Sequence, residues 1–422
     1  MTASADPAAG DAEVRIPDVR PSTLGAFAFR DFRLLWSGLL VSNLGTWMQF
    51  TALGFYVASL APNGRVGSFD IGLIGAARAL PVLLLSPFAG VVADRYPRRA
   101  VLFCTNGAAA LLSLITFVLI FTAHAPLWAL MVSSGLQAAT QSFDAPARQS
   151  WVPLLVPREY VGAAIGLNSV AFNAPSVVGP PLAGLLISGI GVAPCFLANA
   201  ALTLAVVVAL VFMKPAPPSS LRRGNVVAAI AEGVRFLIGH PVLRWVVLLL
   251  VIVSLTVRPY SFLLPAYAIH VIHTGARGLG WLFAASGAGA ICGAFFTAAT
   301  GADRRGRIWL ISAAVASAGV GLLGLTTSFG IAAAILTVVG LATLSFISSS
   351  NILLQTLAPD DMRGRAVSVY SMILLGLVPL GSLLVGVLAT VLELRWTFVL
   401  AGVVACACAV AIGATKPAVR DA

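Results

Sequence analysis

Charged residues are scarce in this chain of 422 residues: Asp, Glu, Lys and Arg make up 10% of it, and hydrophobic residues make up 59%. A soluble domain carries about 25% charged residues, so this composition excludes a soluble globular protein. The four histidines are scattered, and only His270 and His273 lie close together, where a loop is expected. The sequence contains no cluster of His, Asp and Glu of the kind that an active site needs. We therefore expect neither enzyme activity nor a bound metal or cofactor.

The chain also lacks a phosphate loop of the form GxxxxGKS or GxxxxGKT, which excludes ATP hydrolysis by the chain itself. Its five cysteines lie within or at the edges of apolar runs and form no CxxC pair, so they are expected to be small buried hydrophobes. A net charge of +11 would suggest nucleic acid as the partner of a soluble protein. In this chain Lys and Arg follow a membrane topology instead, and we expect no nucleic-acid partner.

Continuous apolar sequence is abundant. About twelve runs approach or exceed the ~20 residues that a helix needs to span a bilayer. They are continuous and rich in Leu, Ala, Val and Gly, whereas a transmembrane barrel would show short alternating segments. The sequence therefore predicts an all-α membrane protein with twelve transmembrane helices. The runs are centred within residues 33–60, 70–92, 100–122, 126–147, 160–188, 192–213, 241–268, 278–300, 308–327, 330–355, 364–391 and 395–414.

The basic residues predict the orientation of these spans. If the N-terminal tail is cytoplasmic, 21 of the 26 Lys and Arg residues fall on that side. Only Arg65, Arg277 and Arg395 fall outside, and Arg78 and Arg258 lie within spans. This asymmetry follows the positive-inside rule. We expect a multi-pass protein of the bacterial cytoplasmic (inner) membrane with both termini in the cytoplasm.

The longest polar interruption runs from Lys214 to about His240 and separates six apolar runs from six others. Within it, residues 226–238 place apolar side chains at helical spacing against Glu232 and Arg235, which predicts an amphipathic helix on the inner membrane surface. A cytoplasmic extension of the seventh span is the alternative. The expected organisation is a disordered cytoplasmic tail (1–25), a six-helix bundle (26–213), the linker (214–240), a second six-helix bundle (241–415) and a cytoplasmic tail (416–422).

The two halves also correspond in sequence. A shift of 202 residues superimposes the fifth and eleventh spans, and a shift near 209 superimposes the loops after the second and eighth spans. A duplicated six-span unit explains both, and parallel repeats of this kind occur in secondary transporters. Chance matching of helices rich in Gly and Ala is the alternative.

The loop after the second span packs four charges into the stretch Gly90 to Arg99. With twelve spans and a long central loop, this stretch resembles the major facilitator superfamily, whose motif at this loop reads G-x-x-x-D-R-x-G-R followed by Lys or Arg. Pro97 stands where that motif has its second Gly. The residues that match the motif are Gly90, Asp94, Arg95, Arg98 and Arg99, and the second copy supplies Asp303, Arg304 and Arg307.

The resemblance implies that Asp94 engages the cytoplasmic start of the eleventh span and latches the outward-facing state. Arg363 or Arg365 would add a charge-assisted bond there, and a helix N-terminus favours an anion. A purely topogenic cluster of charges is the alternative.

A second motif lies in the fifth span. It resembles the antiporter motif of major facilitator exporters, with Pro175 and Ala183 in place of two of its glycines. Gly and Pro permit a close, kinked contact between the two halves. An ordinary Gly-rich packing helix is the alternative. Gly166, Gly179, Pro180 and Gly184 match the motif, and Pro175 occupies the position of a replaced glycine.

Three further stretches resemble the enterobactin-exporter-like branch of that superfamily, the transmembrane secretion effectors. They are Phe32 to Gly45 in the first span, Gly233 to Leu237 before the seventh, and Ile347 to Arg365 from the tenth span into the eleventh. This resemblance implies efflux of a siderophore-like or amphipathic small molecule from bacteria.

Ionisable groups within spans are costly and therefore functional candidates. Arg78 lies near the middle of the second span and Arg258 in the outer third of the seventh, where snorkelling outward is the alternative. Asp144 in the fourth span is a further candidate, and Arg148, one helical turn later, can pair with it. No carboxylate lies at the midplane, so proton coupling is left open. A cavity lined by spans one, four, seven and ten is expected to present Asn43, Gln49, Gln137, Gln141, Tyr260, Asn351 and Gln355, each of which has an interhelical hydrogen bond as the alternative.

Together these features predict a monomeric secondary transporter that exports a small amphipathic molecule by alternating access. Its expected partners are a small-molecule substrate, protons and the lipid bilayer. An importer (symporter) of the same fold is the first alternative. A membrane enzyme or scaffold without transport is the second.

Overall fold

The computed structural model describes residues 24–213, 226–300 and 305–420, and these are helical except at short connections. After a 3-10 turn, η1 (Gly25–Ala28), the first half consists of α1 (Arg30–Leu60), α2 (Gly64–Arg95), α3 (Arg98–Phe121), α4 (Leu127–Trp151), the turns η2 (Val152–Leu155) and η3 (Arg158–Tyr160), α5 (Val161–Asn173), α6 (Pro175–Ile190) and α7 (Ala193–Phe212). The helix α8 (Val226–Gly239) follows. The second half consists of α9 (Leu243–Thr256), α10 (Tyr260–His270), α11 (Ala276–Ala299), α12 (Arg305–Leu325), α13 (Phe329–Leu357), α14 (Asp360–Met372), the π-helical η4 (Ile373–Leu377), α15 (Val378–Thr415) and α16 (Pro417–Arg420).

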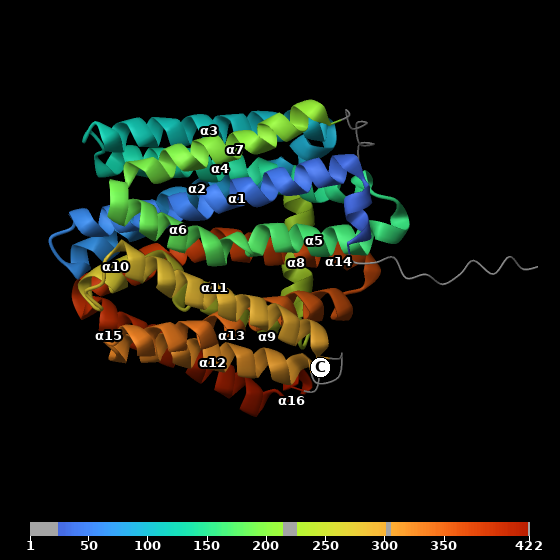
Figure 1. The fold of residues 1–422 in the computed structure, drawn as a ribbon. Coiled ribbons are helices and arrows are strands. Elements are labelled where there is room, and N and C mark those ends of the chain that lie inside the picture. The colour runs from blue at the N-terminus through green and yellow to red at the C-terminus, as the bar shows by residue number, and fades with distance from the viewer. Residues whose placement is uncertain (1–23, 214–225, 301–304, 421–422) are drawn as a thin grey trace, which may run out of the picture.

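The described residues contain twelve membrane spans. Nine helical stretches are long and apolar enough to cross a bilayer, and the last of them, 360–415, joins two spans at Glu393, where φ is 67° and ψ is 152°. The helices α1, of 31 residues, and α4, of 25, run alongside the others (Figure 1), although their polar side chains lower their hydropathy. The predicted fold class, an all-α protein with twelve transmembrane helices, is confirmed.

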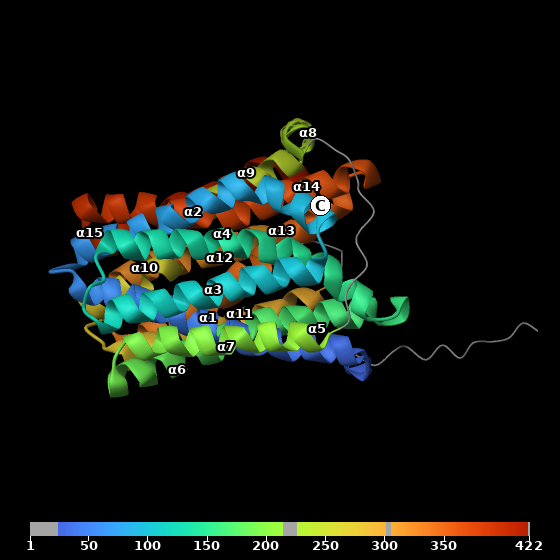
Figure 2. The ribbon, with the colours of Figure 1, turned by 90° about the horizontal axis from the view of Figure 1, so that it is seen from above.

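The spans form two bundles that lie against each other (Figure 1), and in the view from above the first bundle lies in front of the second (Figure 2). Helices α1 to α7 make one bundle and α9 to α15 the other, and α2 packs against α15 and α6 against α11 where the bundles meet. The start of α1 and the short helix α16 lie at the same end of the molecule (Figure 1). We call this end the terminal end and the opposite one the distal end.

Three spans are broken rather than straight. The fifth divides into α5 and α6 at Pro175, and the seventh divides into α9 and α10 at Pro259. Proline lacks a backbone N–H and cannot continue the hydrogen-bond ladder. The eleventh widens into the π-helical η4 between α14 and α15. Such breaks free backbone groups near the middle of the bundle, where they are tolerated because protein surrounds them.

The helix α8 crosses the other helices at the terminal end (Figure 1) and is separate from the seventh span. Its Glu232 pairs with Arg365 of α14 at 2.9 Å. His240 then ends the segment, because its Nδ1 accepts hydrogen bonds from the backbone N–H groups of Val242 and Leu243. Burial lowers the pKa of His240, which keeps the ring neutral and able to accept. In the described part of the chain, α8 ends at Gly239 and α9 begins at Leu243.

The two halves meet closely at the distal end. Arg65 of α2 pairs with Glu393 at 3.0 Å, and His270 Nε2 lies 3.0 Å from the carbonyl oxygen of Ala58. Arg277 Nε donates to Ser188 Oγ at 2.8 Å. Each contact joins one bundle to the other, so the molecule is closed at this end.

We expect the Arg65 and Glu393 pair to contribute little to this closure. Both side chains are more than half exposed, at 51% and 56%, and exposed ion pairs contribute about 0–1 kcal/mol. Arg65→Gln should therefore lower the transport rate by less than about threefold and leave the thermal denaturation midpoint nearly unchanged. A loss of transport in this variant would show that the ion pair, rather than helix packing, holds the distal end closed.

Candidate substrate cavity

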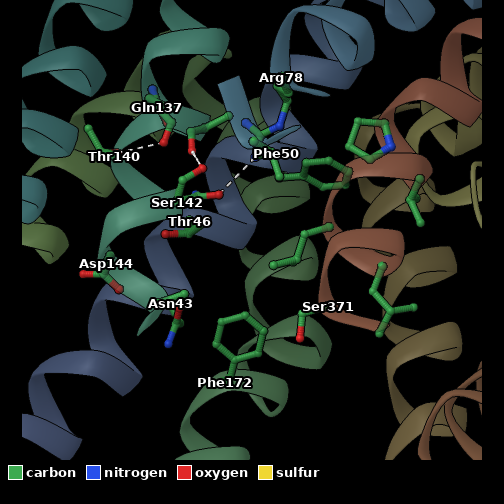
Figure 3. A pocket seen from close by; sticks show the side chains of 18 of the residues that line it. Asn43, Thr46, Phe50, Arg78, Gln137, Thr140, Ser142, Asp144, Phe172 and Ser371 are labelled. Atoms are coloured by element: carbon green, nitrogen blue, oxygen red, sulfur yellow. Dashed lines mark hydrogen bonds between the residues drawn. The ribbon is translucent and has the colours of Figure 1, made fainter. Parts of the chain in front are cut away.

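A cavity of about 1980 Å³ lies between the two halves. Its mouth is lined by residues of the terminal end, among them Arg95, Gln149 and Gly364, and its deep end by Phe50 and Pro265. Figure 3 shows polar side chains of α1, α2 and α4 facing aromatic and aliphatic ones. Ligand pockets commonly measure about 300–1,000 Å³, so this cavity can hold a large organic molecule and water.

Aromatic packing closes the deep end. The Phe50 ring lies 5.2 Å from that of Phe262 and 6.0 Å from that of Phe283, centroid to centroid, in edge-to-face geometry. A methyl group built on Gly54 would lie 2.6 Å from Pro265 Cγ, so α1 and α10 touch here without space between them. The cavity is therefore open at the terminal end and closed at the distal end.

Polar amides of the first half are hydrogen-bonded to one another. Gln49 Nε2 donates to Gln137 Oε1 at 2.7 Å, and Asn199 Nδ2 donates to Gln49 Oε1 at 2.5 Å and to Ser113 Oγ at 2.8 Å. These bonds join α1, α4, α7 and α3. Gln49 and Gln137 line the cavity but are largely buried, so they support the wall that a ligand meets.

Asp144 lines the cavity with its carboxylate held on three sides. Oδ1 accepts from Asn106 Nδ2 at 2.7 Å and from Thr105 Oγ1 at 3.4 Å, and Oδ2 accepts from Arg148 Nε at 3.3 Å. The Arg148 guanidinium also lies 5.3 Å from the centre of the Phe172 ring. Asp144 is the only carboxylate among the described residues that line the cavity.

Arg78 and Arg258 both line the cavity, from opposite halves. Arg78 Nη2 donates to Gln141 Oε1 at 3.3 Å (Figure 3). Arg258 lies in the break between α9 and α10, and its Nη1 is buried without a hydrogen-bond partner. Asn43, also in the lining, donates to the carbonyl oxygen of Ala171 at 3.2 Å.

Three expected lining residues lie elsewhere. Tyr260 is buried and shares a 2.7 Å hydrogen bond with Ser286, and Gln355 donates to Asn351 at 2.8 Å, so these side chains are satisfied outside the cavity. The expectation that the tenth span lines the cavity is therefore wrong, because α13 packs against α11 and α12 instead. The eleventh span takes its place with Ser368 and Ser371.

Sequence reasoning also missed Asn106 and Asn199, which line the cavity from α3 and α7. A single amide within an otherwise apolar run was the signal that could have found them, because such a group needs a partner across helices.

The gating-motif residues that the structure describes lie at the terminal end, and their surroundings differ. Arg95 is exposed and lines the mouth of the cavity, whereas Arg98 is buried and donates from Nε to Ser150 Oγ at 2.9 Å. Arg99 donates to the carbonyl oxygen of Val211 at 3.0 Å. Asp303 and Arg304 lie outside the described residues, as do the side chain of Asp94 and the surroundings of Gly90. Arg307 lies in the first turn of α12.

The two arginines of α14 form ion pairs with carboxylates of α14 itself and of the helix α8. Arg363 pairs with Asp360 at 2.8 Å and donates to the carbonyl oxygen of Gln355 at 3.0 Å. Arg365 pairs with Glu232 of α8. In this conformation both guanidinium groups are bound to the second half or to the linker.

The antiporter-like residues divide between two environments. A methyl group on Gly179 would lie 2.8 Å from Trp47 Cβ of α1, within the first half. One on Gly184 would lie 2.5 Å from the carbonyl oxygen of Ala276, and one on Gly280 would lie 2.6 Å from the carbonyl oxygen of Pro180, so this part packs against α11 of the second half. Pro175 is buried at the break, whereas Gly166 faces open space.

Two six-helix bundles around a central cavity that opens at one end define the class of secondary transporters with alternating access. Residues 21–421 match the profile of the transmembrane secretion effector family. The chain belongs to this family of major facilitator transporters, and it is a membrane transporter rather than an enzyme.

Curated relatives are transporters. The chain is similar to the uncharacterized MFS-type transporter YfiS of Bacillus subtilis, with 28% identity over 77% of this chain and 78% of the relative. It is 27% identical to the multidrug efflux pump Tap of Mycolicibacterium fortuitum over 85% of this chain and 89% of that pump. It is 29% identical to the enterobactin exporter EntS of Escherichia coli over 65% of this chain and 66% of that exporter.

Solved structures share the fold. The nucleoside transporter NupG aligns with a TM-score of 0.71 and 11% identity over 91% of this chain and 100% of that structure. A bacterial homologue of the human lysosomal transporter Spinster, in an inward-facing and unoccupied conformation, aligns with a TM-score of 0.69 and 16% identity. The alignment covers 93% of this chain and 98% of that structure.

Proposed function

We propose that this protein exports a small amphipathic molecule, of siderophore or drug type, from the cytoplasm of a bacterium by alternating access. The observation that carries the proposal is the cavity shared by both halves, which is open at the terminal end and closed at the distal end. The bias of Lys and Arg toward the terminal end supports a cytoplasmic location for that end. The structure then corresponds to the inward-open state, ready to take up a substrate from the cell interior.

Two features support export of an amphipathic compound. The relatives Tap and EntS are an efflux pump and an exporter, and the cavity wall combines amides with the aromatic rings of Phe50, Phe172 and Phe262. Such a wall binds the apolar body of a ligand over a large area and orients it with few hydrogen bonds.

The gate is proposed at the terminal end. Closing the cavity there requires the loop after α2 to approach the start of α14, where Asp94 would meet Arg363 and Arg365. Those arginines now bind Asp360 and Glu232, so closure exchanges one set of ion pairs for another. The antiporter-like segment that ends in Gly184 would keep the distal end closed until the terminal end has closed.

We further propose that export is coupled to protons, with Asp144 as the candidate carrier. Its carboxylate lines the cavity, and its partner Arg148 would be released when the carboxylate is protonated. Reconstituted protein should accumulate substrate when a pH gradient is imposed. The double variant Asp144→Asn with Arg148→Gln, which leaves no unpaired charge, should lose this response.

An efflux assay over siderophores, dyes and antibiotics tests the function, with the native chain compared with Asp94→Asn. Loss of a charge-assisted bond in the gate should slow efflux about tenfold or more at normal expression. The exposed acid Glu159 lies at the same end, so Glu159→Gln is the matched control.

Normal efflux by Asp94→Asn would show that this residue is not the gate. If the native chain moved no compound in cells or in liposomes, export itself would be the wrong function.

A further inference from the structure

We propose that the cavity selects amphipathic organic anions, and that Arg78 of the first half and Arg258 of the second half form a divided site for the anionic group. This inference rests on the proposed transport function and adds the class of substrate. Carboxylates, sulfonates and ionised phenols are the groups that such a site would take.

The charges of the cavity wall are strongly unequal. Among the described residues that line it, five are Arg and one is Asp. Asp144 pairs with Arg148, and Arg365 pairs with Glu232 from α8. Arg78 and Arg258 therefore have no carboxylate partner in the described part of the chain, and they leave the interior with uncompensated positive charge.

Arg258 provides the stronger evidence for the anion site. Its Nη1 is buried without a hydrogen bond, and the titratable side chains with which it interacts are the phenols Tyr370 and Tyr260, not carboxylates. A buried guanidinium without a counter-charge or hydrogen bonds is costly. An anionic ligand in the cavity that Arg258 lines would supply the missing counter-charge, because guanidinium groups bind oxyanions through charge-assisted hydrogen bonds.

Arg78 faces the same cavity from the other half. Its one hydrogen bond goes to the neutral amide of Gln141 at 3.3 Å, which orients the guanidinium without neutralising it. Phe50 and Phe262 lie at the deep end of the cavity and can hold an apolar body beside the charged group.

The location of the two arginines on different halves has a mechanistic consequence. A ligand shifts a conformational equilibrium only by its difference in affinity for the two states. An anion that contacts both arginines attracts both halves, so it would favour closure of the terminal end around itself. A cationic compound of similar size meets repulsion from both and would gain no such advantage.

Two xanthene dyes of opposite charge test the selectivity: carboxyfluorescein, an anion, and rhodamine 123, a cation. Fluorescence anisotropy with the purified full chain reports binding, and exchange of dye across liposomes reports transport. The native chain should bind carboxyfluorescein at least about tenfold more tightly than rhodamine 123, since a charge-assisted hydrogen bond is worth about 1.5–3 kcal/mol.

The variants Arg258→Gln and Arg78→Gln should each weaken carboxyfluorescein binding about tenfold or more without weakening rhodamine 123 binding. Arg258→Lys keeps the charge and should retain part of the affinity. Arg244→Gln is the control, because Arg244 is exposed outside the cavity, where it lies over the ring of Trp245. A thermal denaturation midpoint for each variant shows that it is folded.

Equal affinity for the two dyes, or unchanged carboxyfluorescein binding in both glutamine variants, would overturn the anion site. If carboxyfluorescein bound through both arginines but did not exchange across liposomes, the anion site would stand and the transport function would fail.

Discussion

Replacing Gly184 by leucine should abolish transport and leave the distal end open. A methyl group at this position would lie 2.5 Å from the carbonyl oxygen of Ala276 and 3.1 Å from the Cα atom of Arg277. Both are backbone atoms of α11, which cannot move aside as a side chain does. Overpacking of this kind costs about 1–3 kcal/mol, so the closed distal end should become about tenfold or more less populated.

Labelling from outside the cell measures this change. Leu53 lines the deep part of the cavity, so Leu53→Cys in a cysteine-free background should react with a membrane-impermeant maleimide only when the distal end is open. Gly189→Leu is the matched control on the same helix, because nothing lies within 4 Å of a methyl group built there. Normal transport and no labelling in Gly184→Leu would mean that α6 and α11 can separate without opening the cavity.

Asp144→Asn should markedly destabilise the folded protein. The side chain of its partner Arg148 is only 8% exposed and that of Asp144 20%, so the guanidinium would keep its charge in a largely buried position without its carboxylate. Removing one partner of a buried ion pair costs roughly 3 kcal/mol or more. The thermal denaturation midpoint of the purified protein should fall by several degrees.

The double variant Asp144→Asn with Arg148→Gln separates the effect of the charge from that of the shape. Removing both charges should recover most of the lost stability, because no uncompensated ion is left. Asp360→Asn is the control: it breaks the pair with Arg363, but the Asp360 side chain is 91% exposed, and such pairs contribute about 0–1 kcal/mol. A double variant less stable than Asp144→Asn alone would contradict the assignment.

The spans could be predicted closely from the sequence because the bilayer imposes their length and polarity. The first run was placed at 33–60, where α1 covers 30–60, and the third at 100–122, where α3 covers 98–121. Prolines lie at two of the three breaks that the structure shows, Pro175 and Pro259, and the sequence predicts a kinked contact only at the first. Each of these signals is local, so a single sequence carries it.

The inner face of each span could not be predicted in the same way. In a membrane helix both the lipid-facing and the protein-facing sides are apolar, so hydropathy says little about rotation about the helix axis. Asn351 and Gln355 satisfy each other on α13, whereas Ser368 and Ser371 of α14 reach the cavity. Which residues line the cavity depends on how the two bundles pack, and that is a property of the whole fold.

The glycines where α6 meets α11 and α2 meets α15 determine how the distal closure responds to its surroundings. Methyl groups on Gly280 and Gly386 would lie 2.6 Å from the carbonyl oxygens of Pro180 and Ser68, so these helices touch backbone to backbone. Such contacts carry no net charge, and salt screens only charged groups. Because the exposed pair of Arg65 and Glu393 contributes little, closure on this side should be nearly insensitive to ionic strength. The ion pairs of Arg363 and Arg365 should make the opposite side more sensitive to it. With the terminal end in the cytoplasm, as proposed above, packing would close the side that faces the external medium and ion pairs would control the side that faces the cell interior.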